Sequence, residues 1–200
     1  MGLRKAPNKS VLTLLRMIVG LGNPGRQYQK TRHNAGFWFL DELVGVAGIE
    51  WRQESQFASE FASTKIQGES VFFVKPQNFM NRSGQSVGAV ARYFKIAAEE
   101  ILVVHDELDF EEGVVRLKCG GGHGGHNGLR DIVAGIGSKD FVRLRVGIGH
   151  PGESNKVADY VLSDPSKPGR EKVQDAIARA IAEVDLLYQG DFEQFMTRLH

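Results

Sequence analysis

The sequence predicts a single α/β domain in which a mixed, mostly parallel, twisted sheet is covered by helices on both faces, giving three α/β/α layers. Three observations predict this class. Short apolar runs rich in β-branched residues alternate along the chain with segments of helical period. No internal repeat, low-complexity tract or linker interrupts that alternation. The length of 200 residues, with 42% apolar and 24% charged residues, fits one folded unit with its own core.

Apolar runs that end in turn-forming residues mark the expected strands. MIVGL (17–21) precedes Asn-Pro-Gly and predicts a buried strand. FASTKIQ (61–67) and SVFFVKP (70–76) flank Gly-Glu and predict a hairpin. Three further strands are expected at ILVVHDEL (101–108), VVRLK (114–118) and FVRLRVGIG (141–149).

Apolar residues at helical spacing predict the helices. Asn34 can cap a helix whose apolar positions are Phe37, Leu40, Val44 and Ala47. The other expected helices cover 82–95, a segment that starts near Asn127, and about 170–189.

The first sixteen residues differ from the rest of the chain in charge. They carry Arg4, Lys5, Lys9 and Arg16 with no acid, which leaves 21 basic and 24 acidic residues elsewhere. The body is therefore not a generally basic nucleic-acid binder, and any contact with a polyanion must come from a local patch. We expect 1–16 to be a disordered extension and 17–200 to form the single domain.

The cysteine content and the lengths of the apolar runs indicate the cellular compartment. Cys119 alone excludes an intramolecular disulfide and fits a reducing compartment, and it ends an apolar strand as a small core residue would. No apolar run approaches the roughly 18 residues that cross a membrane. We expect a cytoplasmic protein with no membrane partner.

Two stretches match the dinucleotide pattern G-x-G-x-x-G: Gly20 to Gly25, directly after a strand, and Gly120 to Gly125. The mechanism of that pattern requires the last glycine to open a helix, with an acid at the end of a second strand about 20 residues on. Here a Pro-Gly turn follows, and the acids at that distance, Asp41 and Glu42, fall within the expected helix. A dinucleotide-dependent oxidoreductase is thus a minor alternative.

A histidine and an aspartate stand at the expected ligand-binding edge of the sheet. His33 immediately precedes a helix, and Asp106 ends a buried strand. If the two strands are parallel neighbours, the carboxylate can fix the imidazole tautomer and leave the other nitrogen to deprotonate water. A surface histidine unrelated to a strand-end aspartate is the open alternative.

Amide and basic side chains complete the candidates. Asn23, Asn81 and Asn127 can donate to an oxyanion, although asparagine is also expected in turns and at helix caps. The pairs Arg116/Lys118 and Arg143/Arg145 each share a strand face, where they either bind phosphates or are simply solvated. A metal site made of His105, Asp109, His123 and His126 has no supporting cysteine cluster or HExxH helix, so no metal is expected.

With these residues assembled, the sequence closely resembles the bacterial-type peptidyl-tRNA hydrolases from about Met17 to His200. The motifs that carry the resemblance are GLGNPGRQYQKTRHNAG (20–36), KPQNFMNRSG (75–84), VVHDELD (103–109), GGGHGGHNGLRD (120–131) and FVRLRVGIGHPG (141–152). The resemblance implies a catalytic domain that hydrolyses the ester between a peptide and the terminal ribose of tRNA, with water activated directly and no acyl-enzyme. It implies no metal or organic cofactor.

The resemblance also implies roles for individual residues. His33 matches the general base, Asp106 its carboxylate partner, and Asn23 the residue that helps distinguish N-blocked from free aminoacyl-tRNA. The positions that match substrate-binding residues are Tyr28, Phe79, Met80, Asn81, His126 and Asn127. Lys118 and Arg145 match a basic clamp for the tRNA 5′-phosphate. The expected partner is the acceptor stem and 3′ end of peptidyl-tRNA, bound by a monomer.

Two positions depart from the family pattern. Asn78 stands where threonine is common, and Ser154 stands where some members carry a lysine whose contact Lys156 could take over. A non-catalytic RNA-binding module of the same fold is the alternative from another functional class. We further expect the glycine-rich loop 120–128 to act as a mobile wall that brings Asn127 to the reacting ester.

Overall fold

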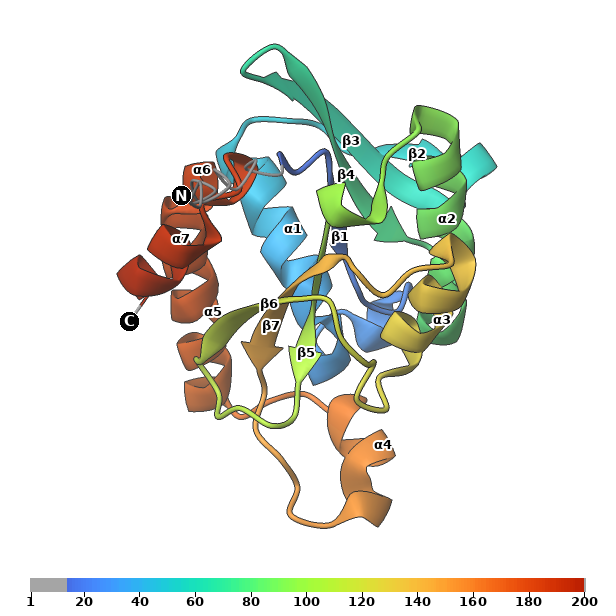
Figure 1. Cartoon of the computed structure of the whole chain (residues 1–200). Helices are drawn as coiled ribbons and strands as arrows, with labels where there is room; N and C mark the ends of the chain where they lie inside the picture. The colour runs from blue at the N-terminus through green and yellow to red at the C-terminus, as the bar shows by residue number, and fades with distance from the viewer. Residues whose placement is uncertain (1–13, 200) are drawn as a thin grey trace, which may run out of the picture.

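One seven-stranded sheet organises the fold of the computed structural model, which describes residues 14–199 (Figure 1). The strand order is β2-β3-β4-β1-β5-β7-β6. The central strands β4, β1, β5 and β7 are parallel, and antiparallel strands flank them on both edges. The predicted mixed sheet is confirmed. The strands are β1 (Met17–Gly20), β2 (Arg52–Glu54), β3 (Ser59–Ile66), β4 (Glu69–Pro76), β5 (Ile101–Glu107), β6 (Val115–Cys119) and β7 (Val142–Gly147).

Helices cover both faces of the sheet, so the predicted three layers are confirmed (Figure 1). Successive strand residues alternate between two cores because side chains point to opposite faces: Ile18 packs with α1 and α5, and Val19 packs with α2 and α3. α6 and α7 pack against α5 and the edge strand β6. The helices are α1 (Ala35–Val46), α2 (Ser83–Phe94), α3 (Asn127–Ile136), α4 (Val157–Val161), α5 (Lys167–Ala182), α6 (Val184–Tyr188) and α7 (Phe192–Leu199).

Short 3-10 helices join several of these elements, at Arg26–Tyr28, Arg32–Asn34, Ser55–Phe57, Met80–Arg82, Ala98–Glu100 and Ser154–Lys156. Within residues 14–199, none of the helices has the length and apolar character that a membrane crossing requires.

The hairpin of β3 and β4 is confirmed, with a turn one residue earlier than the predicted Gly-Glu pair. Ser59 to Ile66 pair in antiparallel register with Pro76 to Glu69. The two turn residues Gln67 and Gly68 have φ of 52° and 88°, which is the left-handed geometry that a tight hairpin turn requires.

Two local predictions, for Asn34 and Cys119, are wrong. Asn34 precedes α1 but makes no side-chain cap bond, because its amide is bound to Asn23 instead. Cys119 is exposed and not a core residue, since it ends the edge strand β6. The fold begins before Met17: Leu15 is buried, and the Arg16 backbone bonds to Glu100 and Phe72. The rest of the predicted extension, 1–13, lies outside the described residues.

Glycines let the start of α1 press against the ends of β1 and β5. A Cβ added at Gly36 would lie 2.3 Å from Leu21 N and from Val104 O, so any larger residue would push α1 away. Leu21 N donates to Val104 O at 2.9 Å, and Phe37 N donates to Leu21 O at 3.2 Å. This contact brings the turn before α1, which carries His33, to the carboxyl end of β5, which carries Asp106.

Candidate active site

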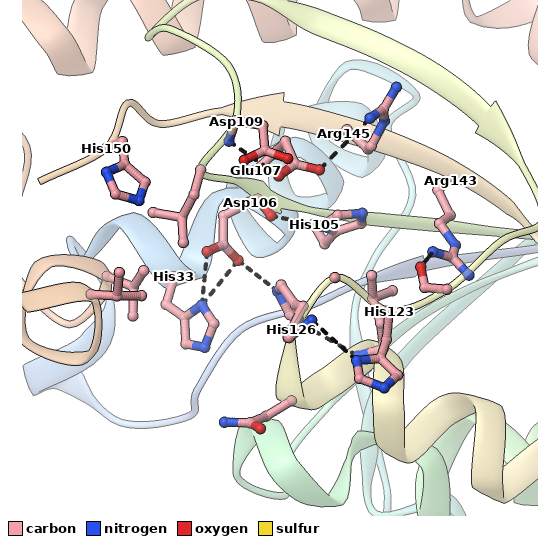
Figure 2. A pocket seen from close by; sticks show the side chains of 18 of the residues that line it. His33, His105, Asp106, Glu107, Asp109, His123, His126, Arg143, Arg145 and His150 are labelled. Carbon is pink, nitrogen blue, oxygen red and sulfur yellow. Dashed lines mark hydrogen bonds and ion pairs between the residues drawn. The ribbon is translucent and has the colours of Figure 1, made fainter. Parts of the chain in front are cut away.

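His33, Asp106 and His126 form one hydrogen-bonded group at the carboxyl edge of the parallel strands (Figure 2). His33 Nδ1 lies 2.9 Å from both Asp106 carboxylate oxygens, and His126 Nε2 lies 2.9 Å from Oδ1. The Asp106 side chain is 2% exposed, and those of His33 and His126 are 13% and 10% exposed. The structure thus brings the predicted His–Asp pair together and adds His126 to it.

The protonation of this group follows from its contacts. Burial favours the neutral imidazole of His33, but the charge of Asp106 and its hydrogen bond outweigh burial and raise the pKa of His33. Burial opposes the Asp106 charge, yet the two histidines hold the pKa of this carboxyl well below its usual range. Because an ionised carboxylate only accepts hydrogen bonds, His33 Nδ1 carries the proton and Nε2 is the free base.

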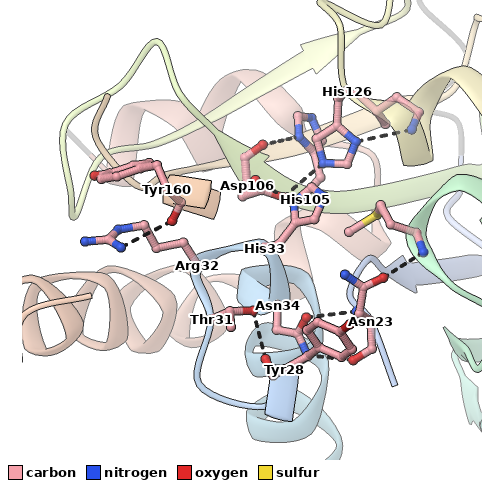
Figure 3. Close-up of polar contacts among 12 residues, drawn as sticks. Asn23, Tyr28, Thr31, Arg32, His33, Asn34, His105, Asp106, His126 and Tyr160 are labelled. Carbon is pink, nitrogen blue, oxygen red and sulfur yellow. Dashed lines mark hydrogen bonds and ion pairs between the residues drawn. The ribbon is translucent and has the colours of Figure 1, made fainter. Parts of the chain in front are cut away.

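Asn23 is fixed near His33 by backbone contacts on two sides (Figure 3). Asn34 Oδ1 accepts from Asn23 N at 2.8 Å, and Asn34 Nδ2 donates to Asn23 O at 3.0 Å. The Asn23 side-chain oxygen accepts from Met80 N at 2.8 Å. Its Nδ2 group is therefore the part of the amide that remains to donate to another molecule.

The same interactions bring the predicted substrate-binding residues near Asn23. Met80 is buried against Gly128 at the start of α3, where an added Cβ would lie 2.6 Å from the methionine sulfur. The Tyr28 and Phe79 rings meet edge to face with centroids 6.4 Å apart, and Phe79 is 57% exposed. Asn81 is exposed on the turn that follows.

A cavity of about 640 Å³ opens on the other side of His33. Five of the six histidines in the chain line it. The predicted site residues that line it are His33, Asp106, Lys118, His126, Asn127 and Arg145. Those that do not are Asn23, Tyr28, Phe79, Met80 and Asn81. The basic cavity thus contains one of the three predicted asparagines, Asn127, whereas the aromatic candidates lie outside it.

The basic side chains of the cavity come from β6 and β7. Lys118 pairs in register with Arg143, and Arg116 with Arg145, so the two predicted pairs lie on the same face of the sheet. Arg145 lies 3.9 Å from Glu107 and over the Phe110 ring. Arg143 is buried and donates to the carbonyls of Gly121 and Gly122, so it binds the glycine-rich loop.

The glycine-rich loop is anchored at its start and open at its tip. Gly120 N donates to Phe141 O at 3.0 Å, next to the two Arg143 contacts. At Gly124 and Gly125 an added Cβ would meet nothing within 4 Å. The loop leads directly into α3, where Asn127 Oδ1 accepts from Arg130 at 3.2 Å and Asn127 lines the cavity with His33.

Sequence reasoning missed Arg32, which holds the His33 turn from its other side (Figure 3). Arg32 N donates to Ser163 O at 3.1 Å, and its guanidinium lies 4.0 Å from the centroid of the Tyr160 ring. Tyr160 in turn donates to Ile148 O at 2.7 Å. A basic residue next to a histidine gives no sequence signal for such a contact, because its partners lie about 130 residues away.

Sequence reasoning also missed the buried state of His105. Its Nδ1 lies 2.6 Å from the Asp106 carbonyl, and Nε2 is buried with no hydrogen-bond partner in the described part of the chain. Burial, and then the neighbouring His126, lower the pKa of His105 to about 3. Its position two residues after Val103 in an apolar strand was the available signal, because such residues share one sheet face.

The possible metal ligands differ from those considered in the sequence. Among residues 14–199, the one set of metal-ligating groups that converges is His33, Asp106 and His126, within 4.8 Å of one another. Their hydrogen bonds account for this convergence, since each imidazole nitrogen that faces Asp106 is within donor distance of the carboxylate.

Neither departure from the family pattern contacts the His33–Asp106–His126 group by a hydrogen bond. Asn78 donates to Arg82 O at 3.5 Å. Ser154 lines the cavity, whereas Lys156 is not among its lining residues and forms an ion pair with Glu153 at 2.6 Å.

The first glycine motif lacks the context of a dinucleotide site. Gly25, with φ of 105°, leads into the 3-10 helix Arg26–Tyr28, and α1 begins only at Ala35. A helix N-terminus that could hold a pyrophosphate therefore does not follow the motif.

An α/β fold whose sheet edge holds a carboxylate-bound histidine with one free nitrogen fits the class of hydrolases that use a general base. The chain belongs to the peptidyl-tRNA hydrolase family, which are carboxylic ester hydrolases: the family model described as "Peptidyl-tRNA hydrolase" matches residues 17–200.

Individual relatives agree with this assignment. The peptidyl-tRNA hydrolase of Methylococcus capsulatus is 55% identical over 94% of this chain and 100% of its own. That of Neisseria gonorrhoeae is 50% identical over 93% of this chain and 97% of its own. The crystal structure of peptidyl-tRNA hydrolase from Acinetobacter baumannii superposes with a TM-score of 0.90 at 46% identity, covering 95% of this chain and 96% of that one.

Proposed function

We propose that this enzyme hydrolyses the ester between a peptide, or another N-blocked aminoacyl group, and the terminal ribose of tRNA, with His33 as the general base. One observation supports the assignment above the others. His33 lines the cavity, and its Nδ1 is hydrogen-bonded to the Asp106 carboxylate at 2.9 Å. This bond leaves Nε2 of His33 to accept a proton from water. General-base assistance of this kind is worth about 10²–10⁴-fold in rate.

The proposed reaction needs only water and the groups of this chain. The water oxygen attacks the ester carbonyl carbon while its proton passes to His33 Nε2. The resulting oxyanion collapses, the bond to the ribose oxygen breaks, and the imidazolium returns the proton to that oxygen. The products are a free peptide and a tRNA with a free terminal hydroxyl, without an acyl-enzyme.

The amide and aromatic side chains then bind the peptide end of the substrate. Asn23 is supported as a donor because its oxygen is already bound to Met80 N, which leaves Nδ2 for the substrate. Asn81 holds the peptide backbone, and Asn127 orients substrate or water. Tyr28, Phe79 and Met80 form the adjoining apolar surface, and His126 lines the cleft.

The basic cavity is the proposed site for the tRNA acceptor stem. Lys118 and Arg145 bind the 5′-phosphate there, supported by their place among the cavity-lining residues. Phosphate contacts of this kind position a nucleic acid without reading its sequence. We further propose that the enzyme acts as a monomer in the cytoplasm.

The test is release of peptide from N-blocked aminoacyl-tRNA by wild type and by His33→Ala, with tRNA binding measured in parallel. We expect the variant to lose turnover while it still binds tRNA, because His33 supplies the base and not the affinity. Near-normal turnover by His33→Ala would refute the mechanism. Tight tRNA binding by a wild type that releases no peptide would instead favour the non-catalytic RNA-binding module.

A further inference from the structure

Both ring nitrogens of His126 are already bound within the protein. Nδ1 lies 3.4 Å from the backbone N–H of Leu129, and Nε2 lies 2.9 Å from Asp106 Oδ1. A backbone N–H only donates, so Nδ1 is the unprotonated nitrogen of the neutral ring. The proton is therefore on Nε2, which donates to the carboxylate. No ring nitrogen is left for a substrate.

Packing also confines the His126 ring. The His105 ring meets it edge-on with centroids 5.0 Å apart, and the His33 ring lies at 5.1 Å (Figure 2). Gly128 leaves the space that the ring uses, because an added Cβ would lie 3.2 Å from His126 Cε1. The side chain is 10% exposed, so it cannot turn toward the cavity without losing these contacts.

The titratable groups that face His126 are His33 from the Arg32–Asn34 turn and His105 and Asp106 from β5. His105 stays neutral at physiological pH because burial and His126 lower its pKa to about 3. Asp106 is therefore the charge that the His126 N–H stabilises.

We propose that His126 is a positioning residue, which holds the Asp106 carboxylate in place for His33, and not a substrate contact. The inference rests on the proposed role of His33 as general base. Without the His126 bond, no N–H group from His126 would offset the negative charge of Asp106, so that charge would act more strongly on His33. The carboxylate would also be free to rotate. Both changes act on the base: the first favours the imidazolium, and the second loosens the orientation of the ring.

Two substitutions separate the two bonds of His126. Asparagine at a helix N-cap accepts from the third backbone N–H, so His126→Asn keeps the bond to Leu129 but is too short to reach Asp106. Glutamine has the reach of the histidine Nε2 atom and an N–H to donate, so His126→Gln keeps the bond to Asp106. Thermal unfolding of both variants reports whether each folds like the wild type.

The decisive measurement is the pH dependence of kcat and KM for release of peptide from N-blocked aminoacyl-tRNA. For His126→Asn we expect kcat to fall roughly 10–100-fold, the range found when the hydrogen-bond partner of a metal-ligating side chain is removed. KM should stay within about twofold, and the rising limb of the pH profile should move to higher pH. His126→Gln should restore kcat and the wild-type midpoint.

A raised KM in both variants, with kcat and the pH midpoint unchanged, would overturn the proposal and make His126 a substrate contact. Wild-type kinetics in His126→Asn would overturn it as well. His33→Ala distinguishes this failure from that of the proposed function, because retained turnover there removes His33 as the base, whatever the His126 variants do.

Discussion

At the scale of single residues, one carboxylate governs the reactivity of His33. Burial alone would lower the pKa of this imidazole, and the charge and hydrogen bond of Asp106 raise it instead. Only the neutral imidazole accepts a proton from water. The carboxylate that orients the proposed base therefore also raises the pH at which His33 becomes neutral. The contact therefore lowers the fraction of His33 that is neutral near pH 7. In return, Asp106 fixes the tautomer of the ring and stabilises the imidazolium that forms.

The pH profile of kcat/KM tests this balance. The rising limb should have its midpoint above 6.5, because the pKa of His33 is raised from that value. Asp106→Asn removes the charge, so the midpoint should move to lower pH, and the plateau should fall as the imidazolium loses its partner. The profiles of wild type and variant on N-blocked aminoacyl-tRNA provide the measurement. An unshifted midpoint in the variant would show that Asp106 does not control this titration.

A second residue-scale effect belongs to His105, whose neutral ring is enclosed between the sheet and His126. Its pKa in the folded protein is about 3, mainly because burial disfavours the charged form. Below about pH 6.5 the unfolded chain binds a proton at this position that the folded chain does not. The free energy of unfolding must then fall as the pH falls from about 6.5 toward about 3.

Urea unfolding at several pH values between 7 and about 4 tests the effect of His105. The wild-type free energy of unfolding should contain a His105 contribution of up to about 1.4 kcal/mol per pH unit. His105→Asn can still donate to the Asp106 carbonyl but does not titrate, so its pH dependence should be shallower by that amount. The difference between the two slopes separates the contribution of His105 to the free energy of unfolding from the contributions of Asp106 and His33. Equal slopes would contradict a buried neutral His105.

At the scale of elements, the site depends on how closely α1 approaches the sheet. Gly36 in the first turn of α1 leaves no room for a side chain between Leu21 and Val104. Gly45 lies in the same helix with nothing within 4 Å of an added Cβ, and it is exposed. A side chain at position 36 would therefore clash with the strands, whereas a side chain at position 45 would extend into open space.

Alanine at each glycine measures that difference. Gly36→Ala should destabilise the protein by about 1–3 kcal/mol, the usual cost of overpacking, and should reduce turnover because the His33 turn moves with α1. Gly45→Ala should stabilise it by roughly 0.5–1 kcal/mol, since alanine is the better helix former. Chemical denaturation of both variants supplies the free energies. Similar values for the two would show that α1 does not press on the strands.

At the scale of the whole molecule, the site has two halves with different chemistry, joined at His33. Asn23 and Tyr28 come from the segment after β1, and Phe79, Met80 and Asn81 from the segment after β4. The basic cavity, which Asn127 also lines, is built on β6, β7 and the glycine-rich loop. This division matches a substrate with a peptide at one end and a polyanion at the other. Salt should therefore weaken binding mainly through the cavity side.

The salt dependence of tRNA binding tests the division. Lys118→Ala should lower the slope of log K against log salt concentration by about one, since each phosphate contact releases counterions. Lys156→Ala is the matched control: Lys156 is paired with Glu153 and does not line the cavity, so its slope should be that of the wild type. The reverse result, with Lys156 and not Lys118 changing the slope, would move the clamp to the segment before α4.

Much of this architecture could be predicted from the sequence, because strand and helix periods are local. The two apolar runs of the hairpin and the stripe of α1 are examples. Contacts between distant segments could not be predicted in the same way. Asn34 has the composition of a helix cap and yet binds the Asn23 backbone, and Cys119 follows apolar residues and yet lies on an exposed edge strand. Such outcomes depend on strand order, which no local pattern encodes.

The pairing of distant strands also determines when, during synthesis, the His33–Asp106 contact can form. β1 pairs with β5 through Met17 and Ile101, and β5 pairs with β7 through Leu102 and Val142. A ribosome makes these strands in that order, so His33 has no Asp106 until more than half of the chain has been made. The His33–Asp106 contact is therefore a product of long-range strand pairing, and it forms only when β5 has joined β1 in the sheet.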